Sequence, residues 1–244
     1  ELRARSAVRA PIKLMLAIGL AVVAGYADAL CIHRYGCFAA MQTGNMIYSA
    51  LAFTRLGTHE SLYHLFPLVC NFFGAAVIGG TGVFRPWAIA PIVAPLLLLL
   101  FLVDDGLGAF GISHRLIVGL PAACLGAQNM LTKEGDLGLM TTLATGSFQR
   151  VALTVSKLLF FKPVDRDEAL VVAACASVIG GTLVGALAGA VAVHFLGDTW
   201  TLAPAAVLQC LCLLGYAYAY EHLPHSPTAH SRAAPEERDD RTEP

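Results

Sequence analysis

Charged residues are scarce in this sequence. Asp, Glu, Lys and Arg make up 14% of its 244 residues, whereas soluble domains carry roughly a quarter. Hydrophobic residues make up 57%, and a soluble domain of this composition would leave much apolar surface in water. We therefore expect an integral membrane protein with the lipid bilayer as its main partner. At about 20 apolar residues per helical crossing, the length suits one domain of six to eight spans.

Sequence motifs for binding and catalysis are also missing. No Lys/Arg-rich tract suggests a nucleic-acid partner. The seven cysteines form no CxxC pair, and no Cys/His spacing fits a metal site. The nucleophile elbow, the phosphate-binding loop and the HExxH motif are all absent. We expect no metal, no cofactor, no nucleic-acid partner and no enzymatic activity.

Apolar segments fill most of the chain. Eight can be marked, at roughly 12–32, 38–54, 62–84, 87–103, 115–131, 137–161, 168–196 and 200–220. We predict a basic N-terminal flank at 1–11, one transmembrane domain at 12–220 and a disordered polar tail at 221–244. The first residue is Glu rather than Met, so we expect a fragment or a processed product.

Two of these segments carry polar breaks. One contains Gln42, Thr43, Gly44 and Asn45, and the other contains Thr145, Gly146, Ser147, Gln149 and Arg150. Lipid offers no hydrogen-bond partners, so irregular backbone in a membrane must face protein or a water-filled cavity. We predict one discontinuous helix in each segment, starting near its Thr-Gly step, with its N-terminus directed at a solute.

The two halves resemble each other. Val77-Ile78-Gly79-Gly80-Thr81 recurs as Val178-Ile179-Gly180-Gly181-Thr182, at an offset of 101 residues. At that offset Gly25 matches Gly126 and Asp28 matches Asn129, and Thr43-Gly44 matches Thr145-Gly146 with one extra residue. We predict an internal duplication, with repeats at about 12–103 and 115–220 joined by a Gly-rich loop at 104–114.

The topology depends on the broken segments. If both cross the membrane, the protein has eight spans and parallel repeats. If both are re-entrant, it has six spans and inverted repeats. Six spans place Lys133, Lys157, Lys162 and Arg166 on the side of the N-terminus, and Arg55 and Arg115 opposite. Eight spans place all of these except Lys133 on the N-terminal side. Both put the two termini in the cytoplasm.

Two charged residues stand out within apolar surroundings. Asp28 ends the first run, and Arg150 lies inside the sixth segment, where a charge costs roughly 2.5–3.5 kcal/mol on insertion scales. Asp28 could cap a helix end at the interface, or could serve an ion, a proton or Arg150. Arg150 could snorkel to an interface. We predict that Arg150 points into the protein, towards a carboxylate, a set of backbone carbonyls or a polar cavity, and we nominate Asp28 as its partner.

Two sets of residues resemble a known family. The run from Ala24 to Ala29, then Phe38, Met41 and Thr43-Gly44-Asn45, is similar to the first signature of the YoaK-like bacterial membrane proteins. Gly126-Ala127-Gln128-Asn129, followed by Thr141-Thr142 and Thr145-Gly146, resembles their second signature. The resemblance covers roughly 14–220. It implies a multi-pass protein of a bacterial-type inner membrane, or of an organelle membrane derived from one, in a family of unknown function.

The function that we predict is a small secondary transporter or channel-like carrier for a small polar or anionic solute. The candidate solute-binding residues are Asp28, Gln42, Thr43, Gly44, Asn45, Gln128, Asn129, Thr145, Gly146 and Arg150. The alternative is a non-transporting scaffold subunit of a larger assembly. Gly-rich helix faces would support such an assembly or a homo-oligomer.

Overall fold

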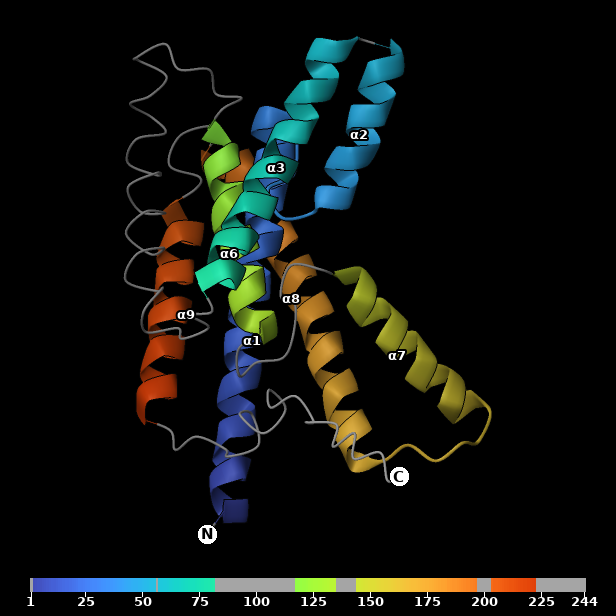
Figure 1. Ribbon diagram of the computed structural model, residues 1–244. Helices are drawn as coiled ribbons and strands as arrows, with labels where there is room; N and C mark the ends of the chain where they lie inside the picture. Colours follow the sequence, from blue (N-terminus) through green and yellow to red (C-terminus); the bar gives the residue numbers. More distant parts are fainter. Residues whose placement is uncertain (1, 56, 82–116, 135–143, 197–202, 223–244) are drawn as a thin grey trace, which may run out of the picture.

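Helices account for all the secondary structure described. The computed structural model describes residues 2–55, 57–81, 117–134, 144–196 and 203–222, which contain seven α-helices and no β-strand (Figure 1). They are α1 (Leu2–Tyr35), α2 (Gln42–Arg55), α3 (Thr58–Thr81), α6 (Gly119–Glu134), α7 (Ala144–Leu159), α8 (Arg166–Leu196) and α9 (Ala203–His222). The predicted helical class is confirmed. The predicted segment at 87–103 and the loop at 104–114 lie outside the described residues, as does the predicted tail beyond His222.

Local sequence explains several helix ends. Gly36 ends α1 with φ 69°, and its N–H donates to the carbonyl of Ile32 at 3.1 Å. Gly57 follows α2 with φ 94°. These left-handed conformations favour glycine, which has no Cβ. At the start of α8 the Asp165 carboxylate accepts a 2.7 Å hydrogen bond from the N–H of Glu168, as an N-cap residue does.

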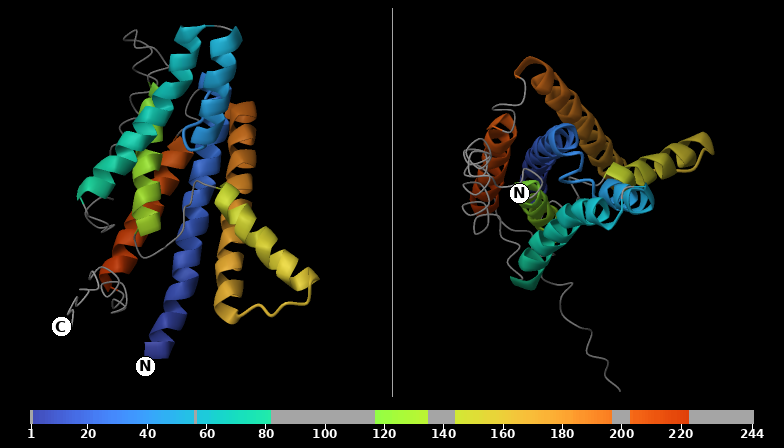
Figure 2. Two further views of the ribbon diagram at one scale, coloured as in Figure 1. Left: turned by 45° about the vertical axis from the view of Figure 1, so that its right-hand side comes forward. Right: turned by 90° about the horizontal axis from the view of Figure 1, so that it is seen from above.

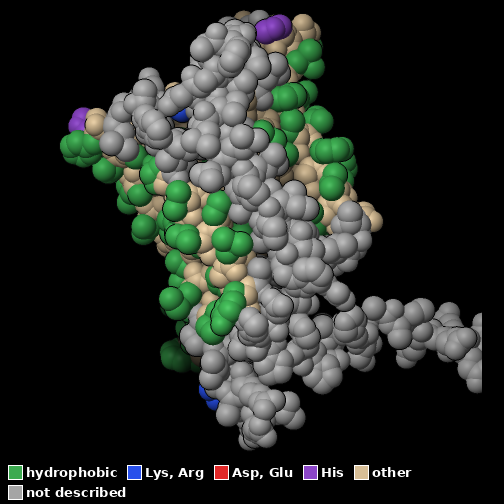
Figure 3. Space-filling model, turned by 90° about the vertical axis from the view of Figure 1, so that its left-hand side faces the viewer, with side chains coloured by type: hydrophobic (Ala, Val, Ile, Leu, Met, Phe, Trp, Pro, Cys, Tyr) green, Lys and Arg blue, Asp and Glu red, His purple; other side chains and the backbone are tan. Residues whose placement is uncertain are grey.

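Among the described residues, three helices are long and apolar enough to cross a membrane: Leu14–Tyr35, Thr58–Gly80 and Glu168–Phe195. The second and third leave most of their surface uncovered, with exposed apolar side chains such as Phe72 and Leu183. On the face drawn in Figure 3, hydrophobic side chains predominate and Lys, Arg and His are few among the coloured residues. The protein is therefore a helical membrane protein.

The helices pack in a few strong pairs. α1 packs on α8 and on α9, α3 packs on α6, and the short helices α2 and α7 pack on α3 and α8 respectively (Figure 2). In the first pair, a Cβ built at Gly25 would lie 2.0 Å from the carbonyl oxygen of Thr182. A Cβ at Gly185 would lie 2.0 Å from that of Val22. Glycine at both positions lets the two backbones touch.

The same contact recurs between α3 and α6. A Cβ at Gly74 would lie 1.9 Å from the carbonyl oxygen of Ala123, and one at Gly126 would lie 2.0 Å from that of Asn71. In both pairs each glycine faces the carbonyl three residues before the partner's glycine. Gly25 and Gly126 therefore make similar contacts with the helices that pack on them.

The third helix of each half follows a different register. The contacts make Gly74, rather than a residue of 77–81, equivalent to Gly185. Thr182 faces Gly25, whereas Asn71, rather than Thr81, faces Gly126. The predicted equivalence of 77–81 with 178–182 is therefore not the one that the helix contacts give. The connection between α7 and α8, at 160–165, is four residues longer than the connection between α2 and α3, at 56–57, which accounts for part of this difference in register.

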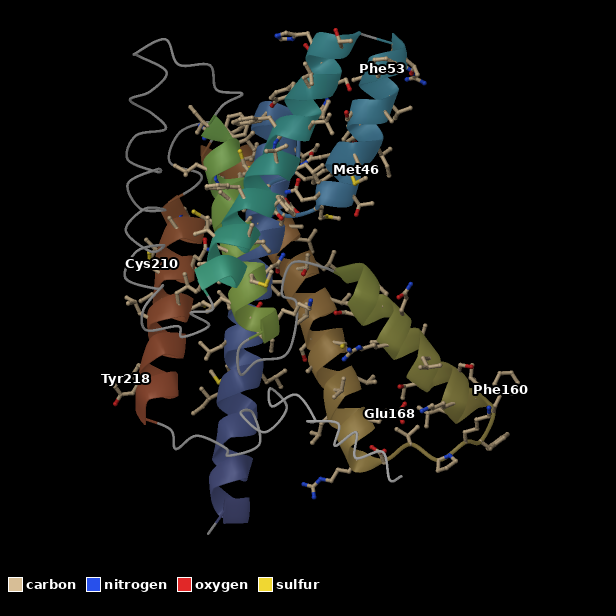
Figure 4. All side chains as sticks on the ribbon, viewed as in Figure 1. Met46, Phe53, Phe160, Glu168, Cys210 and Tyr218 are labelled. Atoms are coloured by element: carbon tan, nitrogen blue, oxygen red, sulfur yellow. The ribbon has the colours of Figure 1, made fainter. Side chains whose placement is uncertain are left out.

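The helix directions also differ between the halves. Figures 1 and 2 show α1 and α8 running one way, and α3, α6 and α9 running the other. α2 begins part-way along the bundle and rises to the end near Phe53 (Figure 4). α7 also begins part-way, but runs to the opposite end, where Phe160 and Glu168 lie. Among the described helices, α1, α2 and α3 therefore run opposite to α6, α7 and α8 respectively.

Candidate functional site

Asp28 lies at the centre of the first candidate site. It belongs to α1 and is buried, with 5% of its surface exposed. One carboxyl oxygen accepts a 2.7 Å hydrogen bond from the N–H of Ala40, and the other accepts a 3.2 Å bond from that of Met41. Both donors lie directly before Gln42, where α2 begins. Asp28 therefore caps the start of α2 across the break.

Asn45 closes the loop between α1 and α2. Its Oδ1 accepts from the N–H of Phe38 at 2.8 Å, and its Nδ2 donates to the carbonyl of Phe38 at 2.7 Å and to Oε1 of Gln42 at 3.0 Å. Gln42 Nε2 donates to the carbonyl of Ala39 at 2.7 Å. Side chains thus supply the partners that the irregular backbone cannot find in lipid.

Gly44 and an aromatic series complete this region. A Cβ at Gly44 would lie 2.5 Å from the ring of Phe38, so only glycine lets that ring lie against α2. The Phe38 ring stacks near Tyr48 at 6.0 Å, and Tyr48 stacks on His64 at 5.5 Å. The Tyr63 hydroxyl donates to the carbonyl of Tyr35 at the end of α1. α3 therefore holds the loop from the other side.

The second half has polar residues of a different kind. Gln128 on α6 is buried, and its Oε1 accepts a 2.6 Å hydrogen bond from Nε2 of Gln209 on α9. Asn129, which matches Asp28, is half-buried, and its carbonyl accepts from the Thr132 hydroxyl at 3.2 Å. Gln128 and Asn129 therefore belong to the packing around α6. No hydrogen bond among the described residues joins them to Asp28.

The remaining candidates lie at the helix starts and on α7. Thr43 is exposed in the first turn of α2. Thr145 is the second residue of α7. Gly146 is exposed, and a Cβ there would meet nothing within 4 Å. The structure therefore brings together Asp28, Gln42, Gly44 and Asn45, but not the second-half candidates.

The predicted pairing of Arg150 with Asp28 is wrong. Arg150 is exposed on α7, and no ion pair with Asp28 occurs among the described residues. The reason is that both Asp28 oxygens already accept backbone N–H groups. The ion pair that ties α7 to α8 is instead formed by Lys157 Nζ and Glu168 Oε1, 2.7 Å apart.

Two contributors were missed in the sequence. Tyr63 is one of many aromatic residues in apolar runs, and nothing in its spacing signals a contact with the loop. Gln209 did carry a signal, because it is a lone amide in the apolar helix α9. No group of three or more His, Cys, Asp or Glu side chains that could hold a metal occurs among the described residues.

The signature residues of both halves lie within one family match. The family described as "Protein of unknown function (DUF1275)" matches residues 16–215. The chain belongs to this family. The resemblance to YoaK-like proteins is consistent with DUF1275 and is confirmed. Comparison with curated proteins and with solved structures gives no match. Family membership accounts for the paired signatures but brings no activity to this DUF1275 protein.

Proposed function

We propose that this DUF1275 protein is a small secondary transporter or channel-like carrier. The observation that carries the proposal is the pair of short helices, α2 and α7. Each begins part-way along the bundle at a Thr-Gly step, and they run to opposite ends (Figures 1 and 4). In many transporters, discontinuous helices of this kind direct their N-termini at a solute near the membrane midplane.

An inverted duplication is part of the proposal. The glycine contact between α1 and α8 has a counterpart between α6 and α3, and the packing of α2 on α3 has one in α7 on α8. The helices of the two halves run in reversed directions. Inverted repeats around a central site let one half rock against the other, as alternating access requires.

We further propose that α2 and α7 are re-entrant. With the apolar segment predicted at 87–103, this gives six crossings. Lys157 and Arg166 then lie at the end where α1 begins, together with the basic N-terminal residues, and Arg55 lies at the other end. The positive-inside rule puts the first end in the cytoplasm of a bacterial-type inner membrane, or on the corresponding side of an organelle membrane.

The solute that fits is small and polar or anionic. At the α2 start, Asp28 already supplies an acceptor and would repel an anion. In the second half, the residue that matches Asp28 is Asn129 on α6, which is neutral, and Gly146 at the start of α7 leaves open space. We propose that the solute's polar or anionic group approaches α7, with Thr145 and Arg150 on the same helix, while Thr43 faces it from α2.

A flux assay tests the proposal. The purified protein is reconstituted into liposomes, and osmotic swelling is followed by light scattering in potassium formate, nitrate and phosphate with valinomycin, and in urea and glycerol. Flux of one or more solutes above that of empty liposomes is expected. Gly146→Phe should abolish it, whereas Gly180→Phe should not, although both glycines have nothing within 4 Å of a Cβ.

The same assay distinguishes a carrier from a non-transporting scaffold subunit. A scaffold subunit would give no flux with any solute in the panel, although the protein is folded and correctly inserted. Equal flux through Gly146→Phe and Gly180→Phe would remove the start of α7 from the pathway. The scaffold alternative is supported by the first break, where Gln42 and Asn45 form hydrogen bonds with the loop and with each other.

A further inference from the structure

Asp28 is an acid buried within the apolar span Leu14–Tyr35. Its two oxygens hold the amides of Ala40 and Met41 at 2.7 and 3.2 Å, directly before α2. We infer that Asp28 binds and releases the proton that drives transport, and that its protonation loosens the α1–α2 loop. This inference rests on the proposed carrier function and names its coupling ion.

In the part of the chain that the structure describes, the surroundings of Asp28 provide no cation. No Lys, Arg or His forms an ion pair with it among the described residues. The nearest titratable group in the loop is the Cys37 thiol, which lies 3.3 Å from the Tyr63 hydroxyl of α3. α8 meets this part of α1 through Gly185 and Gly189, which have no side chain.

α6 also meets this region without a charge. Its buried residues in the shared cluster are Val118, just before the helix, and Leu125. Lys133 lies eight residues further along α6, in its last turn. A carboxylate enclosed in this way is costly in a membrane, and taking up a proton removes the charge.

The hydrogen-bond geometry favours a proton over a metal cation. Hard cations such as Ca²⁺ and Mg²⁺ need six or more oxygen ligands around them. Here both Asp28 oxygens point at N–H donors, whose positive ends would repel a metal ion. A proton needs only one oxygen and no coordination sphere. It passes from water on one side to the carboxylate, and later from the carboxylic acid to water on the other side.

Protonation changes what Asp28 can accept. The ionised group accepts at both oxygens, whereas a carboxylic acid has one hydroxyl that acts as a donor. Two donors, the hydroxyl and the N–H of Ala40 or Met41, would then face each other. The bond at the protonated oxygen is weakened, so the start of α2 is held less firmly to α1. The loop therefore has two states that the proton selects.

The second half carries no equivalent acid. Asn129 stands where the 101-residue offset matches Asp28, and an amide cannot take up this proton. The inverted halves are therefore chemically unequal. One proton per transport cycle follows from this difference, bound in the first half while the solute occupies the second.

The test measures proton movement directly. Proteoliposomes loaded with the pH dye pyranine receive an inward gradient of each salt in the flux panel. In the wild type, a transported solute should change the internal pH. Asp28→Asn should lose this pH change but keep downhill solute flux. Asp165→Asn, which removes an exposed carboxylate at the start of α8, should behave as wild type. Solute flux with no pH change, or an unchanged response in Asp28→Asn, would overturn the inference.

Loop release is measured separately from transport. Hydrogen exchange at Ala40 and Met41 should be about tenfold faster in Asp28→Asn than in the wild type at one pH, since a hydrogen bond to a charged group contributes about 1.5 kcal/mol or more. Unchanged exchange would contradict the switch.

A spectroscopic measurement tests the protonation of Asp28 even if Asp28→Asn does not fold or if no solute crosses the membrane. Infrared spectra of protein with ¹³C-labelled aspartate should show the C=O stretching band of a buried protonated carboxyl, shifted by the isotope. In Asp28→Glu this band should no longer show the isotope shift, because glutamate is not labelled. Absence of this band at every pH refutes the inference. A complete lack of solute flux alone refutes only the carrier function.

Discussion

At the scale of single residues, the first break depends on a few polar side chains that replace missing backbone partners. Asn45 is fully buried and forms two hydrogen bonds with the backbone of Phe38. Asp28, Gln42 and Asn45 stand out in the sequence because polar side chains in an apolar run require hydrogen-bond partners within the protein. It could not assign their partners, because those depend on how the loop folds back.

Asn45 gives the most direct stability prediction. Asn45→Ala should lower the free energy of unfolding by about 2–4 kcal/mol, because the N–H and the carbonyl of Phe38 each lose a partner. The neighbouring exposed Thr43→Ala should change it by about 0.5 kcal/mol or less. Thermal unfolding in detergent measures both. Equal melting temperatures for the two variants would mean that the Asn45 bonds do not hold the loop.

At the scale of helices, close backbone contacts define two equivalent pairs. The sequence predicts contacts with an assembly or a homo-oligomer for the Gly-rich helix faces, whereas Gly74 and Gly185 touch helices of the same chain. The register of α3 against α6 could not be predicted from the sequence. Gly79 and Gly80 align with Gly180 and Gly181, but the glycine of α3 that contacts the backbone of α6 is Gly74. Only the position of the partner helix distinguishes them.

Substitutions of glycine test these contacts. Gly25→Ala should destabilise the protein by about 1–3 kcal/mol or more, because its methyl group would overlap the Thr182 carbonyl. Gly80→Ala meets nothing within 4 Å and should stabilise α3 by about 0.5–1 kcal/mol, through the lower entropy of the unfolded chain. Chemical unfolding in mixed micelles compares the two. A Gly25→Ala variant as stable as Gly80→Ala would show that α1 and α8 do not touch here.

At the scale of the whole molecule, helix direction bears on the two topologies left open by the sequence. With eight spans, the α2–α3 and α7–α8 connections would share one side of the membrane. In the structure they lie at opposite ends of the bundle, near Phe53 and Phe160 respectively (Figure 4). This arrangement supports our proposal of six spans with α2 and α7 re-entrant.

Labelling from one side tests this topology. Cysteine is introduced at Thr58 or at Lys162 in a background without the native cysteines, and a membrane-impermeant maleimide is added to cells. Thr58→Cys should react from outside, and Lys162→Cys should react only after the cells are opened. Reaction of both from the same side would restore the eight-span, parallel arrangement. The unmodified background is the control.

The sequence by itself determined the membrane class, the helical fold, the family and the residues of the break, because these follow from composition, apolar length and local polar patterns. Tertiary structure alone decided the partner of Asp28, the exposed position of Arg150 and the register of α3 against α6. Hydropathy reports how well a residue tolerates lipid. It carries no information on which helix lies beside another or on which way each one runs.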